Sequence, residues 1–198
     1  MYRKVIKRVL DIIISLAALI ILSPVLLVVA ILVRCKLGSP VIFHQERPGY
    51  HEKIFKLCKF RSMTDERDAE GNLLPDAVRL TKFGKILRAA SLDELPELWN
   101  ILKGDMSFVG PRPERPEFIA KAVEDIPEFV LRTKVKDGLT RYAQVMGNYN
   151  TSFLDKLKWD LMYIENYSLF LDLKILLMTA IAIFAKDNHE DFSKWDML

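Results

Sequence analysis

The feature that most constrains the fold is an uncharged stretch near the N-terminus. Ile12 to Val33 is a run of 22 residues without a charged side chain. A helix that rises about 1.5 Å per residue would be about 33 Å long over this run, enough to cross a hydrocarbon layer of about 30 Å. We therefore predict a membrane-associated helix. A removed signal peptide is not expected, because no small-residue cleavage site follows the run.

Ser23-Pro24 lies at the centre of this run and complicates a simple crossing. Pro24 removes a backbone donor and kinks or breaks a helix, and Ser23 can hydrogen-bond a carbonyl that the break leaves free. A spanning helix usually has more basic residues on one side than on the other. Here they flank both ends: Arg3, Lys4, Lys7 and Arg8 before the run, Arg34 and Lys36 after it. The residues alone leave two interpretations open, a spanning helix and a re-entrant helix that returns to the same face.

The composition limits the function classes. Charged residues make up 28% of the 198 residues, too many for a protein with several membrane spans, and a net charge of +3 does not indicate nucleic acid binding. The chain has two cysteines, Cys35 and Cys58, and three histidines, and their spacing forms neither a disulfide nor a zinc pattern. We expect a reducing, cytoplasmic setting for the main body.

After the run, the pattern predicts an α+β fold that is mainly helical. Two short strands, Val41 to Phe43 and Ile54 to Phe60, enclose a Pro-Gly turn and indicate a hairpin. Basic residues on this hairpin usually form a solvated face, but they could also meet phosphates: Arg47, Lys53, Lys56, Lys59 and Arg61. Thr64 to Pro75 is predicted to be a mobile loop, and Thr81 to Ala90 a short helix.

The C-terminal half is predicted to be largely helical. A helix over Pro116 to Lys134 is interrupted near Pro127, and Gly138 to Val145 is expected to be a turn that enters an extended segment. Leu154 to Tyr167 is a predicted helix, whose core face would hold Leu154, Leu157, Leu161 and Ile164. Leu169 to Ala185 is apolar but carries Asp172 and Lys174, which leaves too short a stretch to span, so a core or interfacial helix is expected.

Two adjacent carboxylates, Asp93 and Glu94, stand at the predicted start of a helix from Pro96 to Leu102 that Gly104 closes. Adjacent side chains in one turn point in different directions, so one could attack a substrate while the other holds a cation. The alternative is a capping box, in which Ser91 caps the helix and Glu94 reaches back to it. Pro96 disfavours that alternative, because a helix capped by Ser91 would have Pro96 inside its second turn, where proline removes a backbone hydrogen bond.

Arg112 stands between Pro111 and Pro113. The two prolines would fix the backbone and aim the guanidinium. The alternative is a rigid turn that carries a surface arginine.

Several motifs occur in a fixed order along nearly the whole chain. They are Arg47-Pro48-Gly49, Lys59-Phe60-Arg61-Ser62-Met63, Ser91-Leu92-Asp93-Glu94-Leu95-Pro96 with Arg88 before it, Asn100-x-Leu102-Lys103-Gly104-Asp105-Met106-Ser107, Val109-Gly110-Pro111-Arg112-Pro113, Gly138-Leu139-Thr140, Ala143-Gln144-Val145 and the segment from Asp160 to Asp172. Together they resemble the bacterial sugar transferases known as monotopic phosphoglycosyl transferases. The length resembles the minimal form of that family, which has only the catalytic domain and its membrane helix.

The resemblance implies transfer of a phosphosugar from a UDP-sugar to undecaprenyl phosphate, with release of UMP. Asp93 would be the nucleophile and would form a covalent phosphosugar intermediate, and Glu94 would help to bind Mg²⁺. Lys59, Arg88 and Arg112 match basic positions that would bind phosphate, with Arg61 as a weaker candidate. The reaction would be the first membrane step of polysaccharide or glycoconjugate synthesis, ahead of downstream glycosyltransferases. Pro113 to Phe118 resembles members that serve extracellular polysaccharide pathways.

The resemblance also favours the re-entrant interpretation, because the membrane helix of the family breaks at a Ser-Pro pair that Ser23-Pro24 matches. It implies a membrane-anchoring segment over residues 1–36 and a catalytic domain over residues 37–198, with interfacial helices. The protein would lie in the inner membrane and face the cytoplasm.

The chain departs from the family pattern in one loop. Gly147-Asn148 stands where a Gly-Arg or Gly-Lys pair is common, and Arg141 stands where Gly is usual. Either the cation has moved or a substrate contact is lost. The identity of the sugar is left open. The alternative function is a non-catalytic, membrane-anchored scaffold, which the intact Asp93-Glu94 pair disfavours.

Overall fold

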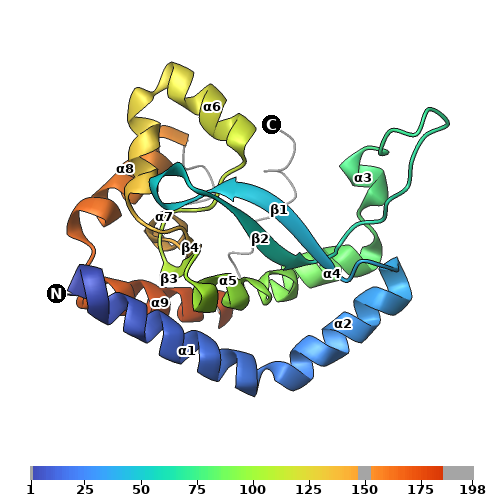
Figure 1. The fold of residues 1–198 in the computed structure, drawn as a ribbon, viewed down its shortest axis with the longest axis horizontal. Coiled ribbons are helices and arrows are strands. Elements are labelled where there is room, and N and C mark those ends of the chain that lie inside the picture. The colour runs from blue at the N-terminus through green and yellow to red at the C-terminus, as the bar shows by residue number, and fades with distance from the viewer. Residues whose placement is uncertain (1, 147–152, 185–198) are drawn as a thin grey trace.

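The computed structural model describes residues 2–146 and 153–184. The fold is α+β and mainly helical, as expected, with two small two-stranded sheets in the described part (Figure 1). The N-terminal and hairpin elements are α1 (Lys7–Ile21), α2 (Ser23–Leu37), β1 (Ile42–Pro48), β2 (Ile54–Phe60), α3 (Asp76–Arg79) and α4 (Lys82–Ala89). The later ones are α5 (Glu97–Lys103), β3 (Ser107–Val109), α6 (Pro116–Asp125), β4 (Gly138–Thr140), α7 (Tyr142–Met146), α8 (Phe153–Asn166) and α9 (Leu169–Phe184).

The predicted break at Ser23-Pro24 is confirmed. Helices α1 and α2 are separated at Leu22 and bent by 63°. Pro24 lies in the first turn of α2, where its missing N–H is tolerated, and the Ser23 hydroxyl donates a hydrogen bond of 2.8 Å to the Ile20 carbonyl. In the described part of the chain, no single helix is long and apolar enough to cross a membrane, whereas the bent pair reaches that length and composition when its two halves are combined.

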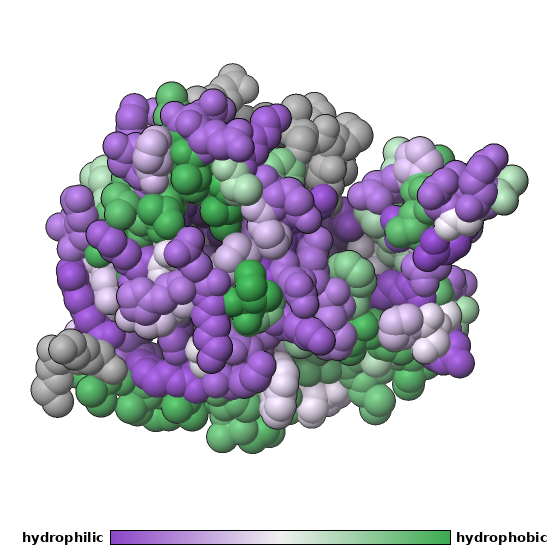
Figure 2. Space-filling view, turned by 45° about the horizontal axis from the view of Figure 1, so that its top comes forward, coloured by the Kyte–Doolittle hydropathy of each residue, from purple (hydrophilic) through white to green (hydrophobic). Residues whose placement is uncertain are grey.

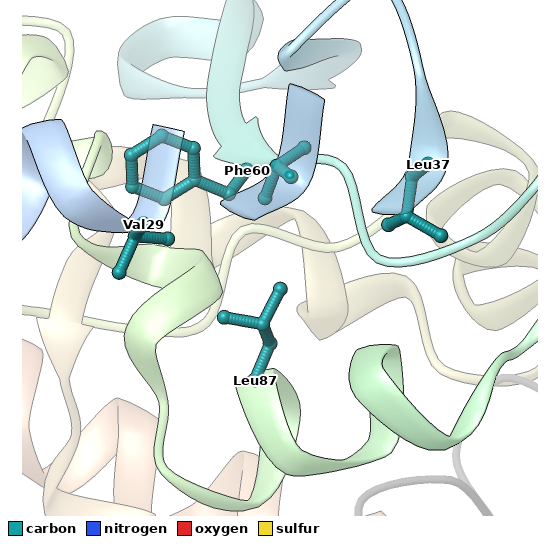
Figure 3. Close-up of a cluster of buried hydrophobic side chains, with 5 residues drawn as sticks. Val29, Leu37, Phe60 and Leu87 are labelled. Carbon is teal, nitrogen blue, oxygen red and sulfur yellow. The ribbon is translucent and has the colours of Figure 1, made fainter. Parts of the chain in front are cut away.

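Helix α2 is held to the body by apolar packing. Its inner face carries Val29, Val33 and Leu37, which pack against Phe60 at the end of β2 and Leu87 of α4 (Figure 3). Because the second half of the broken helix shares this core, α2 and the α4–β2 region form one packed unit.

Helix α1 is held to the body by apolar packing of Ala18 and Leu19 on the cluster around Ile101 and, nearer its start, by polar groups. The Lys7 ammonium donates to the Val109 carbonyl at 3.0 Å, the Tyr163 hydroxyl at 3.2 Å and the Asp172 carboxylate at 2.5 Å. One helical turn further along α1, the buried Asp11 accepts hydrogen bonds from the Ser107 hydroxyl and the Phe108 N–H, at 3.0 and 3.1 Å. The N-terminal basic cluster is therefore partly engaged by the body of the protein.

The β1–β2 hairpin is confirmed as antiparallel, with Ile42 opposite Phe60 and Pro48 opposite Ile54. Strand β1 is longer than predicted, because its polar residues after Phe43 gave no strand signal in the sequence. The parallel pair β3–β4 was not predicted. Its register places Ser107 beside Gly138, so the chain after β3 and the chain after β4 leave the same edge.

Several other expectations are confirmed. Helix α4 begins after Thr81, whose hydroxyl accepts from the Gly84 N–H. The Pro116 to Lys134 helix is interrupted as expected: α6 ends at Asp125 and a 3₁₀ segment runs from Pro127 to Lys134. The loop expected over Thr64 to Pro75 extends from the body as an arm that also carries the short α3 (Figure 1).

Two expectations in the C-terminal half are wrong in detail. Tyr142 to Val145 is not extended but belongs to α7, because Tyr142 and Val145 pack on the cluster around Tyr163. The buried face of α8 is also rotated from the predicted one. Leu157 is buried, but Leu154 is 52% exposed, whereas the polar Asp160 and Tyr163 are buried through hydrogen bonds that a search for apolar periodicity does not detect.

Candidate active site

Asp93 and Glu94 lie in a short 3₁₀ turn, Leu92–Glu94, between α4 and α5. The capping-box interpretation is wrong: the Ser91 side chain forms no cap, and its backbone has a left-handed φ of 52°. Pro96 caps the following helix, so the helix predicted from Pro96 to Leu102 is observed one residue later, with Gly104 after its end at φ 100°. A non-glycine residue at positive φ is uncommon, and it turns the chain sharply just before the two carboxylates.

Asp93 is the more buried of the two carboxylates, with 7% of its surface exposed. No other described residue donates a hydrogen bond to its side chain. Burial raises the pKa of Asp93 to about 6, although the nearby cations Lys59 and Arg88 oppose the shift. The carboxylate is therefore ionised at neutral pH, weakly stabilised, and close to positive charge, which suits a nucleophile toward phosphorus.

Glu94 shares one ammonium group with a third carboxylate, Glu97. The Lys59 Nζ, which comes from β2, lies 2.9 Å from Glu94 Oε1 and 3.3 Å from Glu97 Oε1. Burial disfavours ionisation of Glu94, but Lys59 and Arg112 outweigh it and lower its pKa. For Glu97, which is 3% exposed, burial prevails and raises the pKa. Glu97 was missed from the sequence, although its place in the first turn of the predicted helix, three residues after Glu94, was a usable signal.

The spacing between these carboxylates and Lys59 is fixed by Asn100, which is 1% exposed. Its side-chain oxygen accepts from the Cys58 N–H at 2.9 Å, and its amide donates to the Lys56 carbonyl at 2.8 Å. These bonds fasten α5 to β2 on both sides of a single residue. Asn100 belongs to one of the motifs that carry the family resemblance, but its role was not predicted, since nothing local to it indicates a partner more than forty positions earlier.

Three of the predicted cations surround this turn. Lys59 contacts Glu94 directly, and Arg88 lies near enough to Asp93 to lower its pKa while its Nε donates to the Ser62 hydroxyl at 3.0 Å. Arg112 follows β3 and also lowers the pKa of Glu94. Residues from β2, α4 and the segment after β3 therefore meet at one site, although their roles stay predictions.

The backbone of Arg112 is braced from behind. The Arg132 Nη2 donates to the Arg112 carbonyl at 3.1 Å, and the Arg132 Nε pairs with Asp160 at 2.8 Å. Both partners of that pair are buried. Arg132 comes from the 3₁₀ segment and is itself held by Asp160 of α8, so this brace supports the Arg112 backbone in addition to the two prolines.

Arg61 is used differently. Its guanidinium donates to the Ser39 carbonyl at 2.6 Å and to the Met63 carbonyl at 3.0 Å, and it pairs with Asp65. These contacts join the end of the hairpin to the loop before it. Phosphate binding by Arg61 stays a prediction.

The carboxylates allow a limited kind of metal site. In residues 2–146 and 153–184, no three His, Cys, Asp or Glu side chains are grouped so that they could hold an ion by themselves. Lys59 is the only described residue that hydrogen-bonds the Glu94 side chain, and it does so at Oε1. Mg²⁺ commonly takes one or two protein carboxylates and completes its shell with water and phosphate oxygens. Glu94 fits such a site if the substrate supplies the phosphate oxygens.

Comparison with known proteins decides the family. The model of the bacterial sugar transferase family matches residues 2–186. The chain belongs to the bacterial sugar transferase family. The resemblance carried by the sequence motifs is thereby confirmed, and with it the expectation of a transferase enzyme.

Individual relatives agree. An uncharacterized sugar transferase, EpsL of Bacillus subtilis (strain 168), is 46% identical over 184 residues, which cover 93% of this chain and 90% of the relative. A UDP-glucose:undecaprenyl-phosphate glucose-1-phosphate transferase of Klebsiella pneumoniae is 44% identical over 88% of this chain. A UDP-N-acetylgalactosamine-undecaprenyl-phosphate N-acetylgalactosaminephosphotransferase of Aeromonas hydrophila is 38% identical, also over 88%. The matched part is 39% and 42% of the length of these last two proteins.

Proposed function

We propose that this protein transfers a sugar-1-phosphate from a UDP-sugar to undecaprenyl phosphate and releases UMP. The relatives from K. pneumoniae and A. hydrophila carry names that describe this reaction. The observation that carries the proposal for this chain is the position of Asp93, a buried carboxylate without a hydrogen-bonding partner among the other described residues, beside cations from β2 and α4. A non-catalytic scaffold would not need to retain this arrangement, so that alternative is not favoured.

The proposed reaction has two displacements at one phosphorus. An Asp93 carboxylate oxygen forms a bond to the sugar-bearing phosphorus, and the bond from that phosphorus to the UMP oxygen breaks, so UMP leaves with the electron pair. A phosphate oxygen of undecaprenyl phosphate then attacks the same phosphorus. The acyl-phosphate bond breaks, the polyprenyl diphosphate sugar forms, and the Asp93 carboxylate is restored.

The other residues of the site would neutralise charge. Lys59, Arg88 and Arg112 surround the position that a diphosphate must occupy to meet Asp93, and charge neutralisation is the main catalytic requirement of phosphoryl transfer. Glu94 would hold Mg²⁺, which when bound supplies further positive charge to the phosphate oxygens. Glu97 would keep Lys59 in place while Glu94 engages the cation, because Lys59 already lies between the two carboxylates.

We also propose a re-entrant path for the bent pair α1–α2 in the inner membrane. The supporting observation is that both ends of the pair contact the same body: Arg8 of α1 donates to the Ile101 and Leu102 carbonyls at 2.6 and 2.7 Å, and Leu37 of α2 packs in the α4–β2 core. A helix that crossed the bilayer would separate these ends. The catalytic body would then lie at the cytoplasmic face, where UDP-sugars are found.

The outer faces of the helices fit a lipid environment. Figure 2 shows apolar side chains along the edge of the molecule that α1 and α2 form. Exposed apolar residues there and on α9, which begins beside the start of α1, include Ile13, Leu16, Ile20, Ile21, Leu27, Val28, Phe170, Leu173 and Leu177. An exposed apolar surface of this extent needs a partner, and α9 would lie in the interface.

The topology can be tested by thiol labelling in cells. With Cys35 and Cys58 replaced by Ser, a single cysteine is placed either ahead of Met1 or at Lys36, which is exposed, and probed with an impermeant reagent. Protection of both sites in intact cells and labelling of both after lysis is the expected result. Labelling of the N-terminal cysteine from outside would contradict re-entry. Replacing Ser23 with Ala and Pro24 with Leu tests whether the break sets the path.

The activity is tested by a screen of UDP-sugars for UMP release. The full chain, reconstituted in membranes with undecaprenyl phosphate, is incubated with single UDP-sugars, beginning with UDP-glucose and UDP-N-acetylgalactosamine. Release of UMP together with a lipid-linked product, both absent in Asp93→Asn, is expected. Failure to release UMP from any UDP-sugar would overturn the proposal. A positive result would also name the substrate that downstream glycosyltransferases of a polysaccharide pathway extend.

A further inference from the structure

Arg141 occupies a position beside the site that the mechanism above does not use. It follows β4 directly, as Arg112 follows β3 two residues after Gly110. The Gly110 N–H donates to the Thr140 carbonyl at 3.1 Å, and the Gly138 N–H donates to the Pro111 carbonyl at 2.8 Å. Because the two strands are parallel, the segments that carry both arginines leave the same edge of the small sheet.

This arrangement allows no side chain at either glycine. A Cβ at Gly110 would lie 2.2 Å from the Lys136 carbonyl oxygen, and a Cβ at Gly138 would lie 2.0 Å from the Gly110 nitrogen. The two backbones are therefore closer together than a side chain at either position would allow. The glycines fix the distance between the segments that carry Arg112 and Arg141.

Several charged groups influence the pKa of the Arg141 guanidinium. Burial and then Arg112 lower the pKa of Arg141 to about 10, while Glu94, Glu114 and Asp160 act in the opposite direction. Arg141 in turn helps to lower the pKa of Glu94. The guanidinium is thus near both Arg112 and the Glu94 carboxylate, at the same site.

Arg112 and Arg141 also retain unused donors. Within the described residues, neither guanidinium donates a hydrogen bond to another residue. Arg132 differs: it lies behind Arg112, is buried, and is paired with Asp160 at 2.8 Å. Holding two guanidinium groups close together without an anion between them is unfavourable. A ligand with several negative charges removes this cost, and arginine pairs are well suited to the oxygens of a diphosphate.

We infer that Arg141 is a binding residue for the diphosphate of the nucleotide-sugar donor, which it holds together with Arg112. The inference rests on the proposed function, because the donor is the substrate that brings a diphosphate to this edge. The acceptor carries a single phosphate and can satisfy fewer donors. Arg141 therefore selects for the donor rather than for the acceptor.

The test compares Arg141→Ala and Arg141→Lys with the wild-type chain in steady-state assays that vary the donor and the acceptor separately. Loss of a charged hydrogen bond predicts a rise in the KM for the UDP-sugar of about 10- to 100-fold in Arg141→Ala, with the acceptor KM unchanged. Arg141→Lys keeps the charge but lacks the planar guanidinium that can form two hydrogen bonds to phosphate, so it should recover part of the lost donor affinity. Arg67→Ala removes an exposed arginine on the projecting arm and should change neither constant.

Binding measurements separate this inference from the proposed function. UDP and inorganic pyrophosphate are titrated by calorimetry against the full chain and Arg141→Ala, and thermal unfolding confirms that both are folded. Weaker binding of both ligands in Arg141→Ala is expected even if the chain turns over no UDP-sugar. Unchanged donor KM and unchanged pyrophosphate binding in a folded Arg141→Ala protein would overturn the inference, as would a rise confined to the acceptor KM. If Arg141→Ala does not fold, full donor affinity in a folded Arg141→Lys would also overturn it.

Discussion

Two charged clusters of this protein differ in how their charges are satisfied. At the seam between α1 and the body, Lys7 donates to three acceptors and Asp172 accepts from Lys7, Tyr163 and Tyr2. At the candidate site, Lys59 is shared by two carboxylates, and the Arg112 guanidinium donates to no other described residue. The seam is complete without a ligand, whereas the site has unused hydrogen-bonding capacity.

The pKa values of Tyr163 at the seam and Asp93 at the site show the same difference. Burial, and after it the Asp172 carboxylate, raises the pKa of Tyr163 far above its ordinary value, so its hydroxyl keeps its proton and donates a hydrogen bond to Asp172. At the site, the pKa of Asp93 is instead raised to about 6, which lies close to the pH at which an enzyme works. A tyrosine that holds the fold therefore stays in one protonation state, whereas the Asp93 carboxyl is close to changing its state, as is common for functional groups in enzymes.

The largest expected effect comes from the cation at the site. Glu94 is the carboxylate that fits Mg²⁺, so Glu94→Gln should lower turnover by about 100-fold or more, the scale for loss of a preorganised charge in an active site. Thermal unfolding should change little, because Lys59 keeps Glu97 as a partner. UMP release measured with and without excess chelator checks the metal dependence. Full activity in chelator would show that the cation role is wrong.

A substitution at the seam between α1 and the body should mainly lower the free energy of unfolding. Lys7 and Asp172 form a mostly buried pair, with side chains 14% and 7% exposed. Lys7→Met leaves the Asp172 charge without its cation, and removal of one partner of a buried pair typically costs about 3–5 kcal/mol. Denaturant unfolding of the solubilised chain measures the loss. Lys158→Ala breaks an exposed pair on α8 and serves as the control, with less than about 1 kcal/mol expected. Equal stability of Lys7→Met and wild type would refute the structural role of the seam.

Arg112 should give an intermediate effect, confined to catalysis. Lys keeps the charge but cannot form a bidentate contact to phosphate, so Arg112→Lys should cost about 1–3 kcal/mol of transition-state stabilisation. The value follows from kcat/KM for the variant and for wild type. The free energy of unfolding should be unaltered, because the Arg132 brace binds the main-chain carbonyl and not the side chain. Wild-type kinetics in Arg112→Ala would make it a surface residue.

The smallest effect concerns Asp137, a buried carboxyl whose Oδ2 has no hydrogen-bond partner in the described part of the chain. Burial raises its pKa to about 8. The folded state then holds this proton more tightly than the unfolded state between about pH 4 and pH 8, so the stability that Asp137 contributes is present at low pH and lost as pH rises through 8.

Asp137→Asn cannot ionise and should remove this pH dependence. At pH 8, the variant should be more stable than wild type by about 1 kcal/mol or more, since one pKa unit corresponds to about 1.4 kcal/mol. Unfolding midpoints measured from pH 5 to pH 9 check the trend. Asp125→Asn, on the exposed end of α6, is the matched control and should follow the wild-type curve. A wild-type stability that rises from pH 5 to pH 8 in parallel with the variant would contradict the account.

The parts of the fold that could be predicted are those with local signals. Ser23-Pro24 specified the break between α1 and α2, because proline acts on its own helix. The hairpin, α4 and the approximate limits of α5 followed from turn and cap residues. Asp93, Glu94 and Arg112 were predicted as site residues because they lie in motifs whose residue types suit phosphoryl transfer, and their roles stay predictions.

The parts that were missed depend on contacts between distant segments. Strands β3 and β4 have three residues each, too few for a periodic pattern, yet their pairing brings together the segments that carry Arg112 and Arg141. Glu97 and Asn100 acquire their importance from β2, which lies about forty residues earlier in the chain. Lys7 was interpreted as part of the basic flank of the apolar run, because nothing near it in the sequence indicated that it pairs with Asp172.

We propose that Asp93 carries the phosphosugar during the reaction. The most direct measurement is a quench experiment with a UDP-sugar and no acceptor, followed by intact-protein and peptide mass spectrometry. The account predicts a burst of about one equivalent of UMP and a phosphosugar adduct on the peptide that contains Asp93, with both absent in Asp93→Asn. Turnover that releases UMP only when undecaprenyl phosphate is present, with no adduct at any time, would contradict it.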